Sequence, residues 1–299
     1  MNKKGILSAI LSAVIFGLLP LFTNIIYAMG AGPKSVGFYR VSLSLLPMVI
    51  IQFLLKNSMH VSFKEALGLL IPSLSFIGTI ISLCSSYNYI GSGLATSLHF
   101  LYPSIIFLLT TILTRSRPKL LEVTCLLVAM ISIFMLMGKN TVLDLRGIFL
   151  AILSAFTYSI YSISLQNKNI QEMNSLTKLF FMNFFACIFL LIYVFMTKTS
   201  VFFPNTLPSW LFLLFYSVIL TIGATFLYQK GVELIGAKST ANLSILEPVV
   251  GVLSGMVFMR EKVSFYQMLA IVLILLSTLV LVNFTSEKEI EETKNPRNT

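Results

Sequence analysis

Residues 236–262 read GAKSTANLSILEPVVGVLSGMVFMREK, and residues 91–117 read GSGLATSLHFLYPSIIFLLTTILTRSR. Shifted by 145 positions, the two stretches share a glycine, a proline and an arginine, at the pairs Gly91 and Gly236, Pro103 and Pro248, and Arg115 and Arg260. A second pair, AILSAVIFG at 9–17 and AILSAFTYS at 151–159, is offset by 142 positions. The chain therefore contains one unit twice. We expect the functional site where the two copies meet.

The composition indicates a membrane protein. Hydrophobic residues make up 57% of the 299 residues and charged residues 11%, with a mean hydropathy of +0.91. Soluble domains contain about 25% charged residues. The net charge of +10 comes from lysines and arginines near the ends of apolar segments, without a basic cluster interleaved with aromatic residues. This pattern excludes nucleic acid as a partner and favours a lipid bilayer.

The sequence predicts an all-α integral membrane protein with ten transmembrane helices. The apolar segments cover residues 5–28, 34–55, 65–87, 92–114, 119–137, 147–166, 175–197, 207–229, 238–259 and 264–284. They form two five-helix repeats, at 5–137 and 147–284. The polar tail at 285–299 is expected to be disordered.

Counting lysines and arginines along these segments predicts a cell-membrane protein, inner or plasma, with both termini in the cytoplasm. Five helices per copy is an odd number, so the second copy enters the membrane from the opposite side. The two copies are therefore predicted to be inverted repeats. Secondary transporters use this arrangement, with a binding site near mid-membrane at the repeat interface.

The run LSILEPVVGVLSGMVFMRE at 243–261 resembles the ninth-helix signature of EamA-type proteins of the drug/metabolite transporter superfamily. The similarity extends from residue 5 to about residue 284, through 38–40 (Phe-Tyr-Arg) and 144–147 (Asp-Leu-Arg-Gly). The resemblance implies ten helices around a central cavity lined mainly by helices 1, 3, 4, 6, 8 and 9. It also implies movement of a small organic solute by alternating access, with export favoured.

The family handles amino acids, sugars, drugs and other metabolites, so the resemblance does not name one substrate. We expect an amino acid-like solute or an organic cation. The first copy departs from the signature, because Tyr102 stands where the second copy has Glu247. A mechanism that needs paired acids at both positions is therefore not expected.

Glu247 is the leading candidate for substrate binding. A charged side chain at the centre of a membrane helix costs about 2.5–3.5 kcal/mol on insertion scales unless it is paired, hydrated or neutralised. Glu247 either binds a cationic group or carries a coupling proton, or it is a protonated carboxyl that braces a neighbouring helix. Pro103 and Pro248 are predicted kinks or hinges, with fixed packing as the alternative.

The other candidate binding residues combine aromatic and hydroxyl groups. Residues 151–166 carry a polar and aromatic stripe, and helix 4 adds a histidine and a tyrosine; the candidates are Ser154, Tyr158, Tyr161, Ser162, His99 and Tyr102. His99 shuttles protons or makes an interhelical hydrogen bond. Further donors are expected at opposite cavity mouths, from Tyr87 with Asn88 and from Tyr228 with Gln229. Arg40 lies within reach of the membrane surface and is expected to be mainly structural, with attraction of an anion as the alternative.

The sequence predicts neither an enzyme nor a bound cofactor or metal. It contains no Walker, HExxH, CxxC or GxSxG pattern, and its three cysteines lie in apolar runs without ligand spacing. The expected partners are a small-molecule substrate and the bilayer. The 251–255 GxxxG motif is compatible with a monomer or a homodimer. The alternatives are a proton-coupled drug exporter and a non-transporting accessory or sensor protein.

Overall fold

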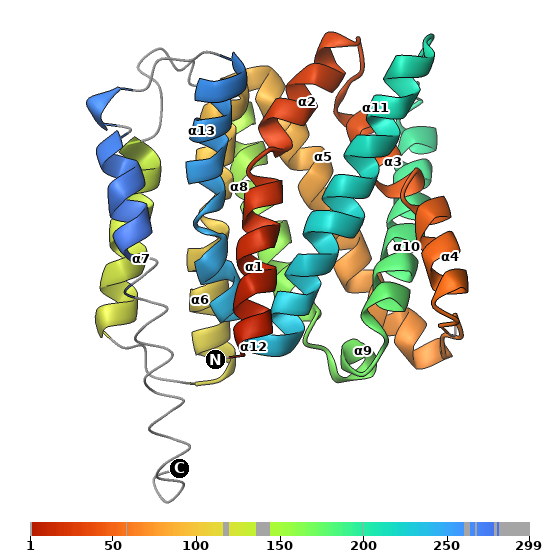
Figure 1. The fold of residues 1–299 in the computed structure, drawn as a ribbon, viewed down its shortest axis with the longest axis horizontal. Helices are drawn as coiled ribbons and strands as arrows, with labels where there is room; N and C mark the ends of the chain where they lie inside the picture. The colour runs from red at the N-terminus through yellow and green to blue at the C-terminus, as the bar shows by residue number, and fades with distance from the viewer. Residues whose placement is uncertain are drawn as a thin grey trace, which may run out of the picture.

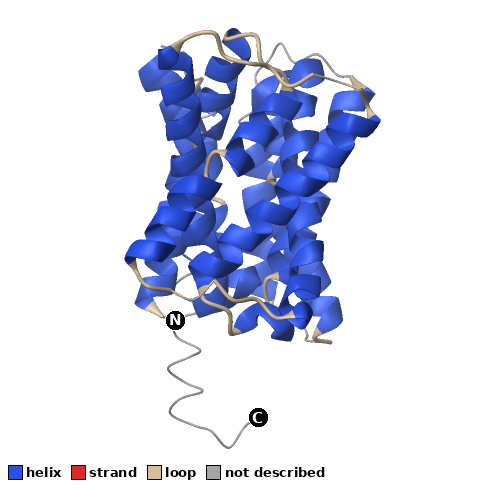
Figure 2. Cartoon of the chain, turned by 90° about the vertical axis from the view of Figure 1, so that its right-hand side faces the viewer, coloured by secondary structure: helices blue, strands red, loops and turns tan. Residues whose placement is uncertain are grey.

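The computed structural model describes residues 2–57, 59–115, 120–135, 144–198, 200–259, 264–266, 268–277 and 280. These residues form helices and connecting loops without a strand (Figure 2). The helices are α1 (Lys3–Phe16), α2 (Leu19–Ala28), α3 (Pro33–Ser42), α4 (Leu45–Leu54), α5 (Phe63–His99), α6 (Tyr102–Leu113), α7 (Leu120–Met135), α8 (Leu145–Ser164), α9 (Lys168–Gln171), α10 (Ser175–Met196), α11 (Leu207–Ser217), the π-helix η1 (Val218–Thr225), α12 (Phe226–Ser244) and α13 (Glu247–Met259).

Seven helical segments are long and apolar enough to cross a membrane. They are Lys3–Ala28, Pro33–Leu54, Phe63–Ser92, Leu94–Leu113, Leu145–Ser164, Ser175–Met196 and Leu207–Ser244. Three shorter apolar helices accompany them, Leu120–Ser132, Glu247–Phe258 and Met268–Ser277. Many large apolar side chains lie exposed on these helices, as expected where lipid replaces water. The prediction of an all-helical membrane protein is confirmed.

Two glycines fold the chain back between neighbouring helices. Gly91 has φ 72° and ψ 159°, and Gly236 has φ 79° and ψ 161°. Only glycine adopts this backbone region readily. The two residues lie at equivalent positions of the two sequence copies. The repeated glycine therefore corresponds to a repeated backbone conformation.

Each of these glycines is followed by a helix that is interrupted once. α5 ends at His99 and α6 begins at Tyr102, while α12 ends at Ser244 and α13 begins at Glu247. Pro103 therefore lies in the first turn of its helix, and Pro248 directly follows the first residue of α13. Both prolines therefore lie at a break in the apolar segment that the sequence predicted around them, and their role as kinks or hinges stays a prediction. Proline fits the first turn of a helix because the missing N–H has no intrahelical acceptor there.

The two halves run in opposite directions. In Figure 1, α1 leaves the N-terminus at the lower end and leads up to α2, whereas α8 leads down to α9. The two halves also pack against each other, because α5 packs mainly against α8 and α1 packs mainly against α12. We call the two ends of the molecule the α2 end and the α9 end.

Several sequence predictions fall outside the described residues. These are Arg260 and Glu261 of the signature and the predicted tail at 285–299. The last predicted segment, 264–284, is described beyond residue 277 only at residue 280.

Candidate functional site

A cavity lies between the two halves, on the α2 side of the molecule's centre. It encloses about 630 Å³ of empty space, counted together with its opening. α1, α2, α3, α5, α8 and α13 all contribute to its wall, so neither half could form it alone. Its lining is mainly apolar, and its polar or ionisable side chains are Arg40, Thr79, Cys84, Tyr87, Thr96, His99, Tyr158 and Glu247.

Glu247 lies at the start of α13, where the helix interruption brings its carboxyl to the cavity. The side chain is only 7% exposed. The hydroxyl of Tyr102 donates a hydrogen bond to Glu247 Oε1 at 3.1 Å. Tyr102 and Glu247 are repeat-equivalent residues, so the two positions that differ between the copies contact each other across the repeat interface.

His99 joins the same site from the C-terminal end of α5. Its Nδ1 lies 2.9 Å from the hydroxyl of Ser154 on α8. Its ring lies 5.3 Å from the Tyr102 ring and 5.4 Å from the Tyr158 ring, measured between centroids. The expected interhelical hydrogen bond of His99 is therefore present in the structure.

Four tyrosines form a packed layer beneath the cavity, which we call the tyrosine layer: Tyr102, Tyr158, Tyr161 and Tyr228. Tyr158 contacts the other three rings, with Tyr102 closest at 4.6 Å between centroids, and Tyr161 also contacts Tyr228. The hydroxyls of Ser162 and Tyr228 are hydrogen-bonded to each other. All four rings are buried. The layer borders the cavity through Tyr158, which lines it.

Arg40 lines the cavity, and its side chain is buried rather than directed to the membrane surface. It is 3% exposed and does not extend to the membrane surface. Its guanidinium lies over the rings of Phe16 and Phe76, at 5.4 and 5.1 Å from their centroids, and its Nη2 donates to Thr225 at 3.3 Å. Its Nε has no hydrogen-bond partner within the described part of the chain. An arginine inside an apolar helix was the signal available in the sequence.

A second, polar pocket lies on the other side of the tyrosine layer, toward the α9 end. Gln229 lines this pocket, and its Nε2 donates to the Tyr161 hydroxyl at 3.4 Å. Tyr158 lines the central cavity on the opposite side. The tyrosine layer therefore separates two pockets along the axis of the molecule.

The structure divides the sequence-predicted residues into two groups. Glu247, His99 and Tyr158 line the central cavity. The others support these side chains or pack in the tyrosine layer beneath them: Tyr102, Ser154, Tyr161 and Ser162. Among the residues expected at the two mouths, Tyr87 and Gln229 line opposite pockets, whereas Asn88 is exposed.

With this geometry in place, comparison with known proteins decides the family. The sequence profile of the EamA-like transporter family matches residues 3–138 and again residues 145–283. The chain belongs to the EamA-like transporter family. The predicted membership in the drug/metabolite transporter superfamily is thereby confirmed, and the protein is a membrane transporter.

One curated relative agrees with this assignment, and one solved structure shares the fold. The chain is 27% identical over 304 residues to an "Uncharacterized inner membrane transporter YicL" of Salmonella typhimurium, covering 96% of this chain and 97% of that protein. It also matches a solved structure, described only as "Crystal structure of protein", with a TM-score of 0.78 and 15% identity. That match covers 97% of this chain and 100% of the other, and at this identity it shows a shared fold.

Proposed function

We propose that the protein is a secondary transporter that moves a small organic solute across the membrane by alternating access. The seven long and three shorter apolar helices support ten membrane segments in two inverted five-helix units, at 5–137 and 147–284. The opposite directions of α1 and α8, and the matched glycines 91 and 236, support the inversion (Figure 1).

The positions of the central cavity and the tyrosine layer are consistent with one state of the alternating-access cycle. Lysines and arginines at the α9 end favour a cytoplasmic location for that end and for both termini. The central cavity then lies on the external side, and the tyrosine layer closes the path to the cytoplasm. Movement of the two halves about this layer would expose the cavity to the other side.

The observation that carries the substrate assignment is that Arg40 and Glu247 line one cavity without pairing with each other. Both side chains are buried, and neither takes part in an ion pair within the described residues. A buried guanidinium and a buried carboxylate complement the carboxylate and ammonium of a zwitterion. The surrounding apolar wall, including Phe16 and Phe76, suits an apolar side chain on the solute. We therefore favour an amino acid-like solute over an organic cation.

The experiment begins with an untargeted comparison of medium and cell metabolites in strains that lack or overproduce the protein. A solute that accumulates in the medium of the overproducing strain identifies the substrate and supports export. The purified protein is then reconstituted in vesicles, and movement of that solute is compared with movement of a quaternary ammonium cation and a monocarboxylate.

Two variants separate the substrate classes, and Arg146→Gln, at an exposed position of α8, controls for the loss of one positive charge. For a zwitterion, Glu247→Gln and Arg40→Gln both reduce transport by about tenfold or more, as expected when one charged contact is lost. For an organic cation, only Glu247→Gln does so. Unchanged transport in both variants would refute the proposed site.

A further inference from the structure

The polar pocket on the α9 side of the tyrosine layer has the chemistry of a separate binding site. It encloses about 460 Å³ of empty space between the end of α8, the start of α10 and α12. Its polar lining consists of Gln166, Gln171, Lys178, Gln229 and Glu233. None of these residues lines the central cavity.

Lys178 is the main feature of this pocket. The residue is 4% exposed and lines the pocket, and the described residues provide its ammonium with no hydrogen bond or ion pair. Lys178 is also the fourth residue of α10, near the positive end of the helix dipole. Because Lys178 lines the pocket, an anion held there would meet the positive charge of its ammonium.

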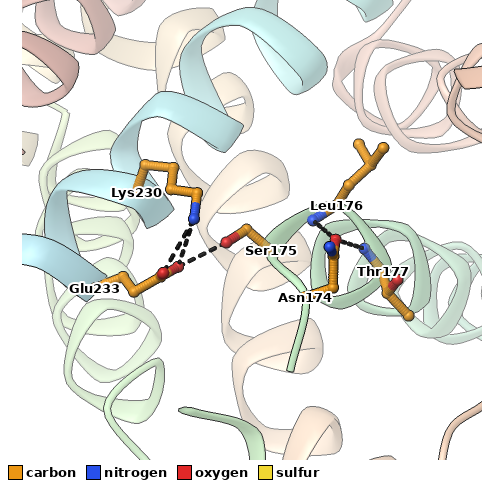
Figure 3. Close-up of polar contacts among 6 residues, drawn as sticks. All are labelled: Asn174, Ser175, Leu176, Thr177, Lys230 and Glu233. Carbon is orange, nitrogen blue, oxygen red and sulfur yellow. Dashed lines mark hydrogen bonds and ion pairs between the residues drawn. The ribbon is translucent and has the colours of Figure 1, made fainter. Parts of the chain in front are cut away.

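The neighbouring carboxylate is already engaged (Figure 3). Glu233 accepts hydrogen bonds from Lys230 Nζ at 3.0 and 3.2 Å and from the Ser175 hydroxyl at 2.6 Å. Among the described residues that line the pocket, Glu233 is the one carboxylate. Glu233 is therefore paired with Lys230, and Lys178 adds a further positive charge beside it.

The helix end itself does not provide the binding groups. Asn174 caps α10, and its Oδ1 accepts from the backbone N–H groups of Leu176 and Thr177 at 3.0 and 3.4 Å (Figure 3). Gln166 and Gln171 instead place side-chain amides, which are hydrogen-bond donors, along the pocket wall.

We propose that this pocket binds the carboxylate or phosphate group of a small anion, with Lys178 as its counter-ion. The ammonium of Lys178 donates to the anion, and the glutamine amides complete its hydrogen bonding. The site is distinct from the central cavity, because the tyrosine layer lies between them. The proposal therefore stands independently of which solute the central cavity carries.

The test measures binding of inorganic phosphate to the full-length protein, purified in detergent without added lipid. Equilibrium dialysis with labelled phosphate is performed at constant ionic strength maintained with chloride. We expect Lys178→Met to weaken phosphate binding by about tenfold or more, the loss that corresponds to one charge-assisted contact. Lys178→Arg, which retains the charge, should keep part of the affinity and shows whether the site tolerates substitution.

Three further variants sharpen the result. Lys168→Met removes an exposed lysine at the same end and should leave phosphate binding unchanged. Glu233→Gln removes the competing carboxylate and should strengthen binding. Glu247→Gln, in the central cavity, should leave binding unchanged, so that failure of the proposed transport site and failure of this site are distinguishable.

A second arm separates a soluble anion from a lipid headgroup. The protein is placed in nanodiscs of phosphatidylcholine alone or with phosphatidylglycerol, and phosphate binding is measured again. Loss of binding with phosphatidylglycerol assigns the site to a lipid phosphate, and unchanged binding assigns it to a soluble anion. The proposal is overturned when wild-type protein binds no phosphate in either arm, or when Lys178→Met binds it as well as the wild type.

Discussion

The two interrupted helices that meet at the centre share a backbone but differ in chemistry. Each begins after a glycine with positive φ, breaks after a short helix and resumes with a proline in the first turn. The first, at residues 92–113, resumes with Tyr102, and the second, at residues 237–259, resumes with Glu247. These two side chains are hydrogen-bonded to each other, so the second half supplies the carboxylate and the first half supplies the hydroxyl that donates to it.

The neighbours of the two breaks show the same relationship. Ser159 Oγ donates to the backbone carbonyl of Tyr102 at 3.2 Å. Gly17, which is equivalent to Ser159 in the first copy, lies so close to α13 that an added Cβ would be 2.8 Å from the carbonyl of Glu247. The backbone at the two breaks is therefore repeated, whereas the side chains around them differ between the two halves.

The largest effect on stability is expected from substituting both glycines that hold the repeated backbone conformation. A Cβ at Gly91 or Gly236 meets open space or only ordinary contact, so Gly→Ala tests conformation alone. Residues held in this backbone region cost about 1–3 kcal/mol each, so the double variant Gly91→Ala, Gly236→Ala should lose about 2–6 kcal/mol of stability. Thermal unfolding in detergent measures this loss.

The control for the glycine variants is Gly32→Ala. A Cβ added at Gly32 would also meet open space, but the φ of this residue is −105°, which other residues adopt. The unfolding temperature of this variant should equal that of the wild type. If Gly91→Ala behaves like Gly32→Ala, the fold-back does not depend on glycine.

The next largest effect on stability is expected at Tyr102 and Glu247, the repeat-equivalent side chains in which the two halves differ. Tyr102→Phe removes the donor to Glu247 and should cost about 1.5–3 kcal/mol if the carboxyl is charged, since hydrogen bonds to charged groups have this magnitude. Thermal unfolding and vesicle transport are measured together. Tyr216→Phe is the matched control, because Tyr216 is also fully buried and its hydroxyl has no partner within the described residues. Equal stability of the two variants would contradict a stabilising role of the Tyr102 hydroxyl.

The smallest effect is expected where α8 contacts the first break. Ser159→Ala removes the hydrogen bond to the Tyr102 carbonyl and should cost about 0.5–1.5 kcal/mol. Ser73→Ala is the control, since Ser73 is buried and its hydroxyl bonds only within its own helix, to Leu69. Ser159 also bonds within its own helix, to the Ala155 carbonyl at 2.8 Å, so the difference between the two variants in thermal unfolding measures the added interhelical contact. A loss no larger for Ser159→Ala would argue against a role at the break.

The sequence by itself determined the features that depend on local pattern. Long apolar runs locate membrane helices, because a helix must satisfy its own backbone hydrogen bonds in lipid. The repeated glycines and prolines revealed the two copies, and the prolines predicted a kink in each copy, where the structure has a helix break. Helical periodicity also placed Ser154, Tyr158, Tyr161 and Ser162 on one face of α8, and that face is buried against other helices.

Only the tertiary structure decided which of these residues border a cavity and which pack behind it. Tyr158 lines the cavity while Tyr161, three positions later, packs against Phe76 and Tyr228. The contact between Tyr102 and Glu247 and the burial of Arg40 and Lys178 likewise depend on helices far apart in the sequence. The physical reason is that burial and pairing are properties of neighbours across the helix interface, and local periodicity does not specify these neighbours.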